Sequence, residues 1–126
     1  MNNLIKLMAF VCLIFTINTA NAQRSATVTP DGLIVLDATL QDLAPEYVAN
    51  LSRFNFTSFQ EANNYFFKYI EKSAGRGITF LFDIANQKLI ISIDVANQGM
   101  VPRAISRPVN VNDINYYLRA VYEGRI

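Results

Sequence analysis

The sequence contains no histidine and only one cysteine, Cys12, which lies within the first 22 residues. Residues 23–126 therefore lack the side chains that proteins use most often as acid–base catalysts, nitrogen ligands and thiolate nucleophiles. No disulfide can form in this part of the chain, so its fold must be stabilised by packing. These absences argue against an enzyme, and we predict no metal site and no cofactor.

An excess of charge of either sign is also missing. The chain has 11 basic and 10 acidic residues, and Lys6 is the only charged residue among the first 22, so residues 23–126 carry a net charge of zero. Proteins that bind nucleic acid or anionic membranes need a clear basic excess. We therefore predict no nucleic-acid partner and no electrostatic binding to a membrane surface.

The first 22 residues have the three parts of a secretory signal peptide. Lys6 lies in a polar start, an apolar run follows over residues 7–17, and Ala20 and Ala22 are the small residues that a signal peptidase requires. The run of about 11 residues is too short to cross ~30 Å of hydrocarbon as a helix. We predict cleavage after Ala22, and a secreted or periplasmic protein with no stable membrane insertion.

Residues 23–31 are polar, include Pro30, and are predicted to form a flexible leader before a single α+β domain over residues 32–126. Apolar periodicity and turn residues divide that domain into elements. The predicted elements are a strand over 33–40, helices over 42–54 and 57–77, a hairpin over 78–95, a connection over 96–110, and a final helix capped by Asn110 or Asn112.

The hairpin "ITFLFDIANQKLIISIDV" alternates apolar and mostly polar residues on both strands. A turn at Asn86-Gln87 places Phe82 opposite Ile91, and eight large apolar side chains share the inner face. Asp83 and Asp94 then lie on the outer face, about 13 Å apart. That separation is too large for the carboxylate pair of a glycoside hydrolase.

The order β–α(α)–β–β–α predicts a small sheet with its helices on one face, because this buries every apolar stripe. It resembles a ferredoxin-like plait whose last strand is short or missing. Small heavy-metal-associated domains share that topology and bind metal through a Cys-x-x-Cys pair after the first strand. The corresponding segment here, "DATLQDLAPEYV", has no cysteine, so the resemblance implies a shape and no copper or zinc transport.

The connection over residues 96–110 is the first candidate binding site. Arg103 and Arg107 lie four residues apart, with Met100 and Ile105 nearby and no acidic residue within the connection. Arginine beside exposed apolar groups is typical of protein interfaces, and it also binds carboxylates and phosphates. The alternative is that both arginines are solvated or pair with nearby acidic residues.

The outer face of the hairpin is the second candidate. Leu81 and Ile90 interrupt its polar residues, and the predicted register makes them diagonal neighbours. An apolar patch on an exposed sheet marks a surface for a partner or for self-association. The alternative is that both are isolated surface residues, which are common in soluble proteins.

We therefore predict a small exported module that acts by binding, with a protein partner or a second copy of itself. The alternatives are a secreted inhibitor-type factor that inserts the 96–110 connection, and a hydrolase built on carboxylates alone. The hydrolase would require Asp37 to meet Asp83 or Asp94. Asn50 and Asn55 each begin an N-glycosylation sequon, and the sequence leaves their modification open.

Overall fold

The computed structural model describes residues 23–96 and 107–126. The predicted signal peptide lies outside these residues, as do Met100, Arg103 and Ile105 of the connection. In the described part, no helix has the length and apolar character needed to cross a membrane. The elements are β1 (Gln23–Val28), β2 (Ile34–Leu36), β3 (Glu46–Asn50), α2 (Phe59–Tyr65), α3 (Phe67–Ser73), β4 (Ile78–Asp83), β5 (Lys88–Ile93) and α4 (Val111–Tyr122).

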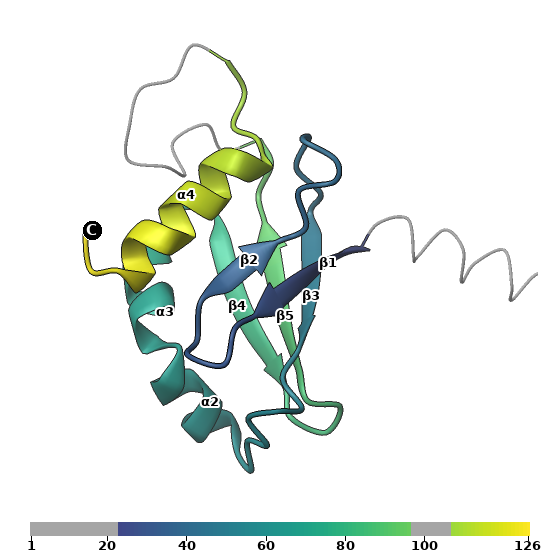
Figure 1. Ribbon diagram of the computed structural model, residues 1–126, viewed down its shortest axis with the longest axis vertical. Helices are drawn as coiled ribbons and strands as arrows, with labels where there is room; N and C mark the ends of the chain where they lie inside the picture. Colours follow the sequence, from purple (N-terminus) through teal and green to yellow (C-terminus); the bar gives the residue numbers. More distant parts are fainter. Residues whose placement is uncertain (1–22, 97–106) are drawn as a thin grey trace, which may run out of the picture.

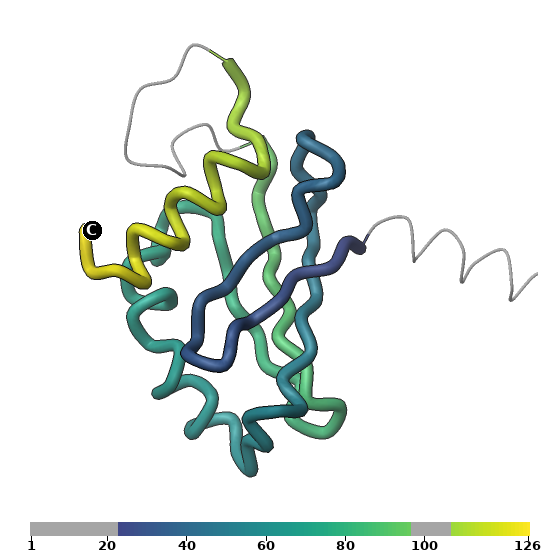
Figure 2. Tube along the Cα trace, in the orientation of Figure 1, coloured from purple at the N-terminus to yellow at the C-terminus, as the bar shows by residue number. Residues whose placement is uncertain are grey.

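The strands form one mixed sheet in the order β2-β1-β3-β5-β4. The pair β1–β3 is parallel and the other pairs are antiparallel. The sheet is curled, so that β1 and β2 run obliquely to β4 and β5 (Figure 2), and the described helices lie on the same side of it (Figure 1). The predicted α+β class is confirmed.

The predicted ferredoxin-like plait is not confirmed, because the strand order differs. Two segments that were expected to lie outside the sheet supply strands to its centre. Residues 23–31 do not form a flexible leader, since β1 pairs with both β2 and β3. Ala26 and Val28 of β1 are buried while Ser25 and Thr27 are exposed, which is the alternation of a strand with one solvated face.

The helix predicted over residues 42–54 is wrong, because residues 46–50 form β3 between β1 and β5. Tyr47, Ala49 and Leu51 are all almost fully buried, and this spacing of two is the period of a strand. The helix was predicted because Tyr47, Val48 and Leu51 also fit one face of a helix. Pro45 precedes the strand, and its carbonyl accepts a hydrogen bond from Ile93.

Two other elements are shorter than predicted. The strand expected over 33–40 ends at Leu36, because the Asp37 carboxylate accepts hydrogen bonds from the backbone N–H and hydroxyl of Thr39 and turns the chain. The helix expected over 57–77 is divided into α2 and α3 at Phe66. The predicted start of that helix is confirmed, since the Ser58 side chain accepts a hydrogen bond from the backbone N–H of Glu61.

The hairpin β4–β5 is confirmed, but its register differs from the predicted one by two residues. Phe82 lies opposite Leu89, and Phe80 lies opposite Ile91. The connection takes four residues, 84–87, because the Asp83 carboxylate accepts two hydrogen bonds from Asn86 and Gln87 adopts a positive φ of 50°. A shift of two residues keeps each side chain on its predicted face, although Val95 is 45% exposed beyond the end of β5.

The C-terminal helix α4 forms as predicted, with Asn110 as its N-cap. The Asn110 side chain accepts a hydrogen bond from the backbone N–H of Asp113, and the Asp113 carboxylate accepts one from the backbone N–H of Asn110. This reciprocal capping box satisfies backbone donors at the helix start. Its buried face has the apolar spacing of a helix, because Ile114, Tyr117 and Leu118 are each at most 1% exposed.

The free edge of β2 is closed by side chains from two helices. The Asn115 side chain of α4 accepts a hydrogen bond from the backbone N–H of Leu36 (2.8 Å) and donates one to its carbonyl (3.0 Å). The Tyr69 hydroxyl of α3 accepts one from the Ile34 N–H (3.3 Å) and donates one to the Gly32 carbonyl (2.9 Å). These side chains occupy the positions that a neighbouring strand would otherwise take.

We expect Asn115→Ala to lower the free energy of unfolding by about 2 kcal/mol, because the N–H and C=O of the buried Leu36 lose their partners. Urea unfolding followed by circular dichroism measures the loss. Asn112→Ala is a matched control, since the Asn112 side chain donates a hydrogen bond to the exposed side chain of Gln41, and it should stay within about 0.5 kcal/mol of the wild type. Equal effects of the two substitutions would contradict a role for Asn115 at the sheet edge.

Candidate functional site

A row of aliphatic side chains crosses the outer face of the sheet, on the side away from the helices. Val48 of β3 lies opposite Ile90 of β5, and Ile90 lies opposite Leu81 of β4. Successive residues of a strand point to opposite faces, so these three residues share the face opposite the buried Ala49, Leu89 and Phe80. We call them the apolar row.

Polar rows flank the apolar row on both sides. Register places Glu46, Ser92 and Thr79 on one side of it. Asn50, Lys88 and Asp83 lie on the other side in the same strand order. Hydrogen bonds from the side chain and backbone of Asn86 lower the pKa of Asp83, so this carboxylate stays charged in mildly acidic solution. The flanking charges are therefore of both signs.

The exposure of the apolar row rises toward the edge of the sheet. Val48 and Ile90 are partly exposed, whereas Leu81 is 51% exposed. The sequence predicted Leu81 and Ile90 as diagonal neighbours, and the observed register makes them directly opposite. Val48 was missed because residues 46–50 were predicted to be helical, which gave no reason to place it on a sheet.

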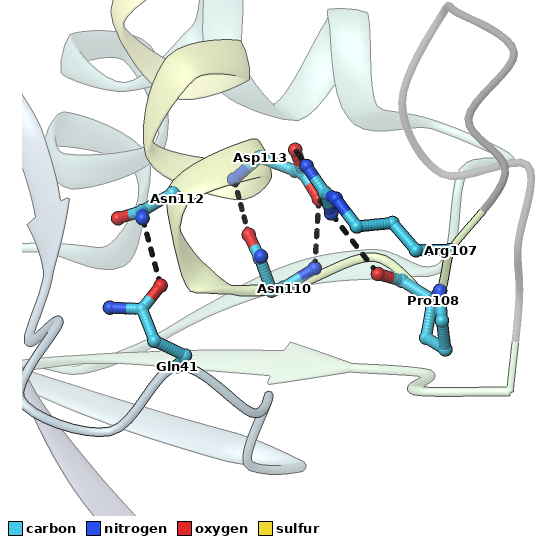
Figure 3. Close-up of polar contacts among 6 residues, drawn as sticks. All are labelled: Gln41, Arg107, Pro108, Asn110, Asn112 and Asp113. Carbon is cyan, nitrogen blue, oxygen red and sulfur yellow. Dashed lines mark hydrogen bonds and ion pairs between the residues drawn. The ribbon is translucent and has the colours of Figure 1, made fainter.

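Arg107, the described member of the predicted loop site, is held by an ion pair at the start of α4 (Figure 3). Its two terminal nitrogens lie 2.6 and 3.0 Å from the two carboxylate oxygens of Asp113. The Asp113 side chain is 3% exposed and that of Arg107 is 50% exposed. The hydrogen bonds and the charge of Asp113 raise the pKa of Arg107. Arg107 thus helps to fix α4. Its pairing with Asp113 is the alternative, a nearby acidic partner, that the sequence left open.

The acidic residues considered for catalysis do not meet. The backbone N–H of Asp94 bonds to the Gly77 carbonyl, so Asp94 lies beside the start of β4, whereas Asp83 lies at its end. The length of β4 separates them by about 20 Å. A cleft of about 380 Å³ beside β1 and β2 has Asp37 as its only acidic lining residue. Within residues 23–96 and 107–126, no group of three acidic side chains is placed to hold a metal ion.

The apolar row is therefore the feature of the described residues that is best placed to bind a partner. It lies on three neighbouring strands, which hold its side chains at fixed spacings, and it projects into solvent. Comparison of the chain with protein-family models and curated proteins, and of its structure with solved structures, found no match.

Proposed function

We propose that this chain is a small exported binding module without enzymatic activity, and that it binds another protein through the outer face of its sheet. The observation that carries the proposal is the apolar row with polar residues on both sides. Export is proposed from the signal-peptide pattern of residues 1–22, with cleavage after Ala22.

The composition of this face supports a protein partner. Antiparallel strands with one solvated face ordinarily carry polar residues there, yet the centre of this face is Val48, Ile90 and Leu81. An apolar centre within a polar rim is the usual anatomy of a protein interface. The rim holds Glu46, Lys88 and Asp83, so the partner should present an apolar centre with charges of both signs around it.

The rigidity of the site favours binding without a large rearrangement. Val48 lies on a strand that is paired on both sides, and Ile90 likewise lies on an interior strand. Their backbones are held by two ladders of hydrogen bonds. A partner that docks here loses little of its binding free energy to the ordering of this chain.

Charged substitutions in the middle of the row test the proposal. We expect Ile90→Lys and Val48→Lys each to lower capture of the partner at least about tenfold, because a charge in an interface centre must be desolvated. The immobilised chain is used to capture proteins from the envelope and the medium of the source organism, and captured bands are quantified against the wild type. Circular dichroism confirms that each variant is folded.

Ser25→Lys is the matched control. Ser25 lies opposite Val48 on β1, at the end of the row, and it is exposed and polar, so the variant should capture the partner normally. Undiminished capture by both Ile90→Lys and Val48→Lys would refute the outer face as the binding surface. If Arg107→Ala alone lost capture, and circular dichroism showed this variant to be folded, the site would instead lie in the 96–110 connection.

A further inference from the structure

The two edges of the sheet differ in whether their backbone groups have partners. The backbone N–H of Asp94 bonds to the Gly77 carbonyl, so by alternation along an antiparallel pair the odd-numbered residues of β4 bond to β5. The N–H and C=O groups of Ile78, Phe80 and Phe82 therefore point away from the sheet. Among the described residues, β4 pairs with β5 alone, and no hydrogen bond reaches these outward groups.

Within residues 23–96 and 107–126, the β4 edge also lacks the devices by which proteins protect an exposed edge. Such edges usually carry lysine, proline or a bulge, or are covered by other elements. The strand "ITFLFD" has no lysine or proline, and its one charge, Asp83, is at its end. At the opposite edge, β2 has only three residues. Tyr69 bonds to the outward N–H of Ile34, and Asn115 bonds to the outward N–H and C=O of Leu36. One edge is closed and the other is open.

We propose that the β4 edge binds the β4 edge of a second copy of this chain, in antiparallel orientation, with Leu81 on the two-fold axis. In this register Phe80 lies opposite Phe82 of the second copy, so the outward groups of both residues exchange hydrogen bonds. Leu81 lies directly opposite Leu81 of the second copy, with both side chains on the outer face. The half-exposed Leu81 thereby becomes buried at the centre of a self-complementary interface.

The charges on β4 agree with this register. Asp83 lies opposite Thr79 of the second copy, whose hydroxyl is a hydrogen-bond donor, so no like charges face each other across the axis. The two apolar rows meet end to end, because Leu81 is the last member of the row on each copy. A continuous aliphatic band then runs from Val48 of one copy to Val48 of the other.

Apolar surface beside the edge widens the contact on the helix side of the sheet. The ring of Phe59, at the start of α2, lies 5.8 Å from the ring of Phe82, and Phe59 is 56% exposed. The edge is thus flanked by Leu81 on the outer face and by Phe59 on the inner face. Burial of both on pairing adds a hydrophobic contribution to that of the backbone bonds.

Pairing at the β4 edge and binding of another protein to the outer face are tested with different residues. Substitutions on β4 test the dimer, whereas those on β3 and β5 test binding of the other protein. If the dimer is not found, capture of the other protein still tests the outer face. If capture fails, the mass measurements still test the dimer.

Two lysine variants on the same face of β4 test the register. Sedimentation equilibrium of the wild type should show an apparent mass that rises with concentration to twice that of one chain. We expect Leu81→Lys to remain monomeric at every concentration, because two ammonium groups would face each other on the axis. Thr79→Lys should still dimerise, since its new charge faces Asp83 of the second copy. A monomeric wild type, or equal behaviour of the two variants, overturns the proposal.

A cysteine trap tests the same contact by an independent measurement. In a Cys12→Ser background, Leu81→Cys should form a disulfide-linked dimer under mild oxidation, because directly opposite residues of such a pair have the Cα separation that a disulfide needs. Thr79→Cys should cross-link at least about tenfold more slowly, since it faces Asp83 of the second copy. Equal rates for the two cysteines, measured on non-reducing gels, refute the register with Leu81 on the axis.

Discussion

Replacement of Tyr69 by phenylalanine is expected to lower the free energy of unfolding by about 3 kcal/mol, because two buried backbone groups lose their partner. The hydroxyl accepts a hydrogen bond from the N–H of Ile34 and donates one to the carbonyl of Gly32. Tyr69 is 2% exposed and Ile34 is 1% exposed, so water has little access to either group. Urea unfolding at neutral pH measures the loss.

The effect of Tyr69→Phe should depend on pH in a defined direction. Burial raises the pKa of Tyr69 to about 12, although the hydrogen bond from the Ile34 N–H acts to lower it. Because this pKa is higher in the folded than in the unfolded state, the Tyr69 hydroxyl contributes its full stabilisation below pH 10. That stabilisation is lost as the pH rises toward 12. The advantage of the wild type over Tyr69→Phe should therefore shrink by about 2 kcal/mol between pH 9 and pH 12.

Tyr65→Phe is the control for this substitution. Tyr65 is 44% exposed, so removal of its hydroxyl should change the free energy of unfolding by less than about 0.5 kcal/mol. If Tyr69→Phe were as mild as Tyr65→Phe, closure of the β2 edge by Tyr69 would not contribute to stability. An effect that stayed constant from pH 9 to pH 12 would contradict the raised pKa of Tyr69.

Asp113→Ala is expected to lower the free energy of unfolding by about 2–3 kcal/mol. The substitution removes half of the capping box at the start of α4 and both carboxylate contacts of Arg107. Loss of a cap costs about 1 kcal/mol. Removal of one member of a buried ion pair costs more, although the half-exposed Arg107 is able to turn toward water, which limits the loss.

Thermal and urea unfolding measure the effect of Asp113→Ala, and far-ultraviolet circular dichroism reports the helix content. Asp42→Ala is a matched control, because the Asp42 carboxylate also pairs with an arginine, Arg24, but its side chain is 78% exposed. An exposed pair contributes at most about 1 kcal/mol. A smaller loss for Asp113→Ala than for Asp42→Ala would show that the capping box and the Arg107 pair do not hold α4.

The elements that the sequence predicted correctly are those with one unambiguous period. In α4, Ile114, Tyr117 and Leu118 fit only a helix, and the long alternation of β4 and β5 fits only strands. Residues 46–50 were mistaken for a helix because so short a segment satisfies both periods. The strand β1 was missed because its outward residues are polar and its inward residues include the small Ala26.

The candidate site could be predicted only in part, for the same reason. Leu81 and Ile90 were recognised because both strands of their hairpin were. Val48 joins them only through the pairing of β3 with β5, a contact between segments about 40 residues apart that no local pattern specifies. The two-residue difference in register arose from the hydrogen bonds of Asp83 and Asn86, whose effect on the length of the turn the sequence did not indicate.

The closure of the β2 edge has a consequence for the size of any assembly that this sheet builds. A subunit with two open sheet edges is able to pair at both of them, and such subunits add to one another without limit, as in a fibre. Tyr69 and Asn115 leave this chain with a single open edge, so that the pairing proposed at β4 would end at two copies.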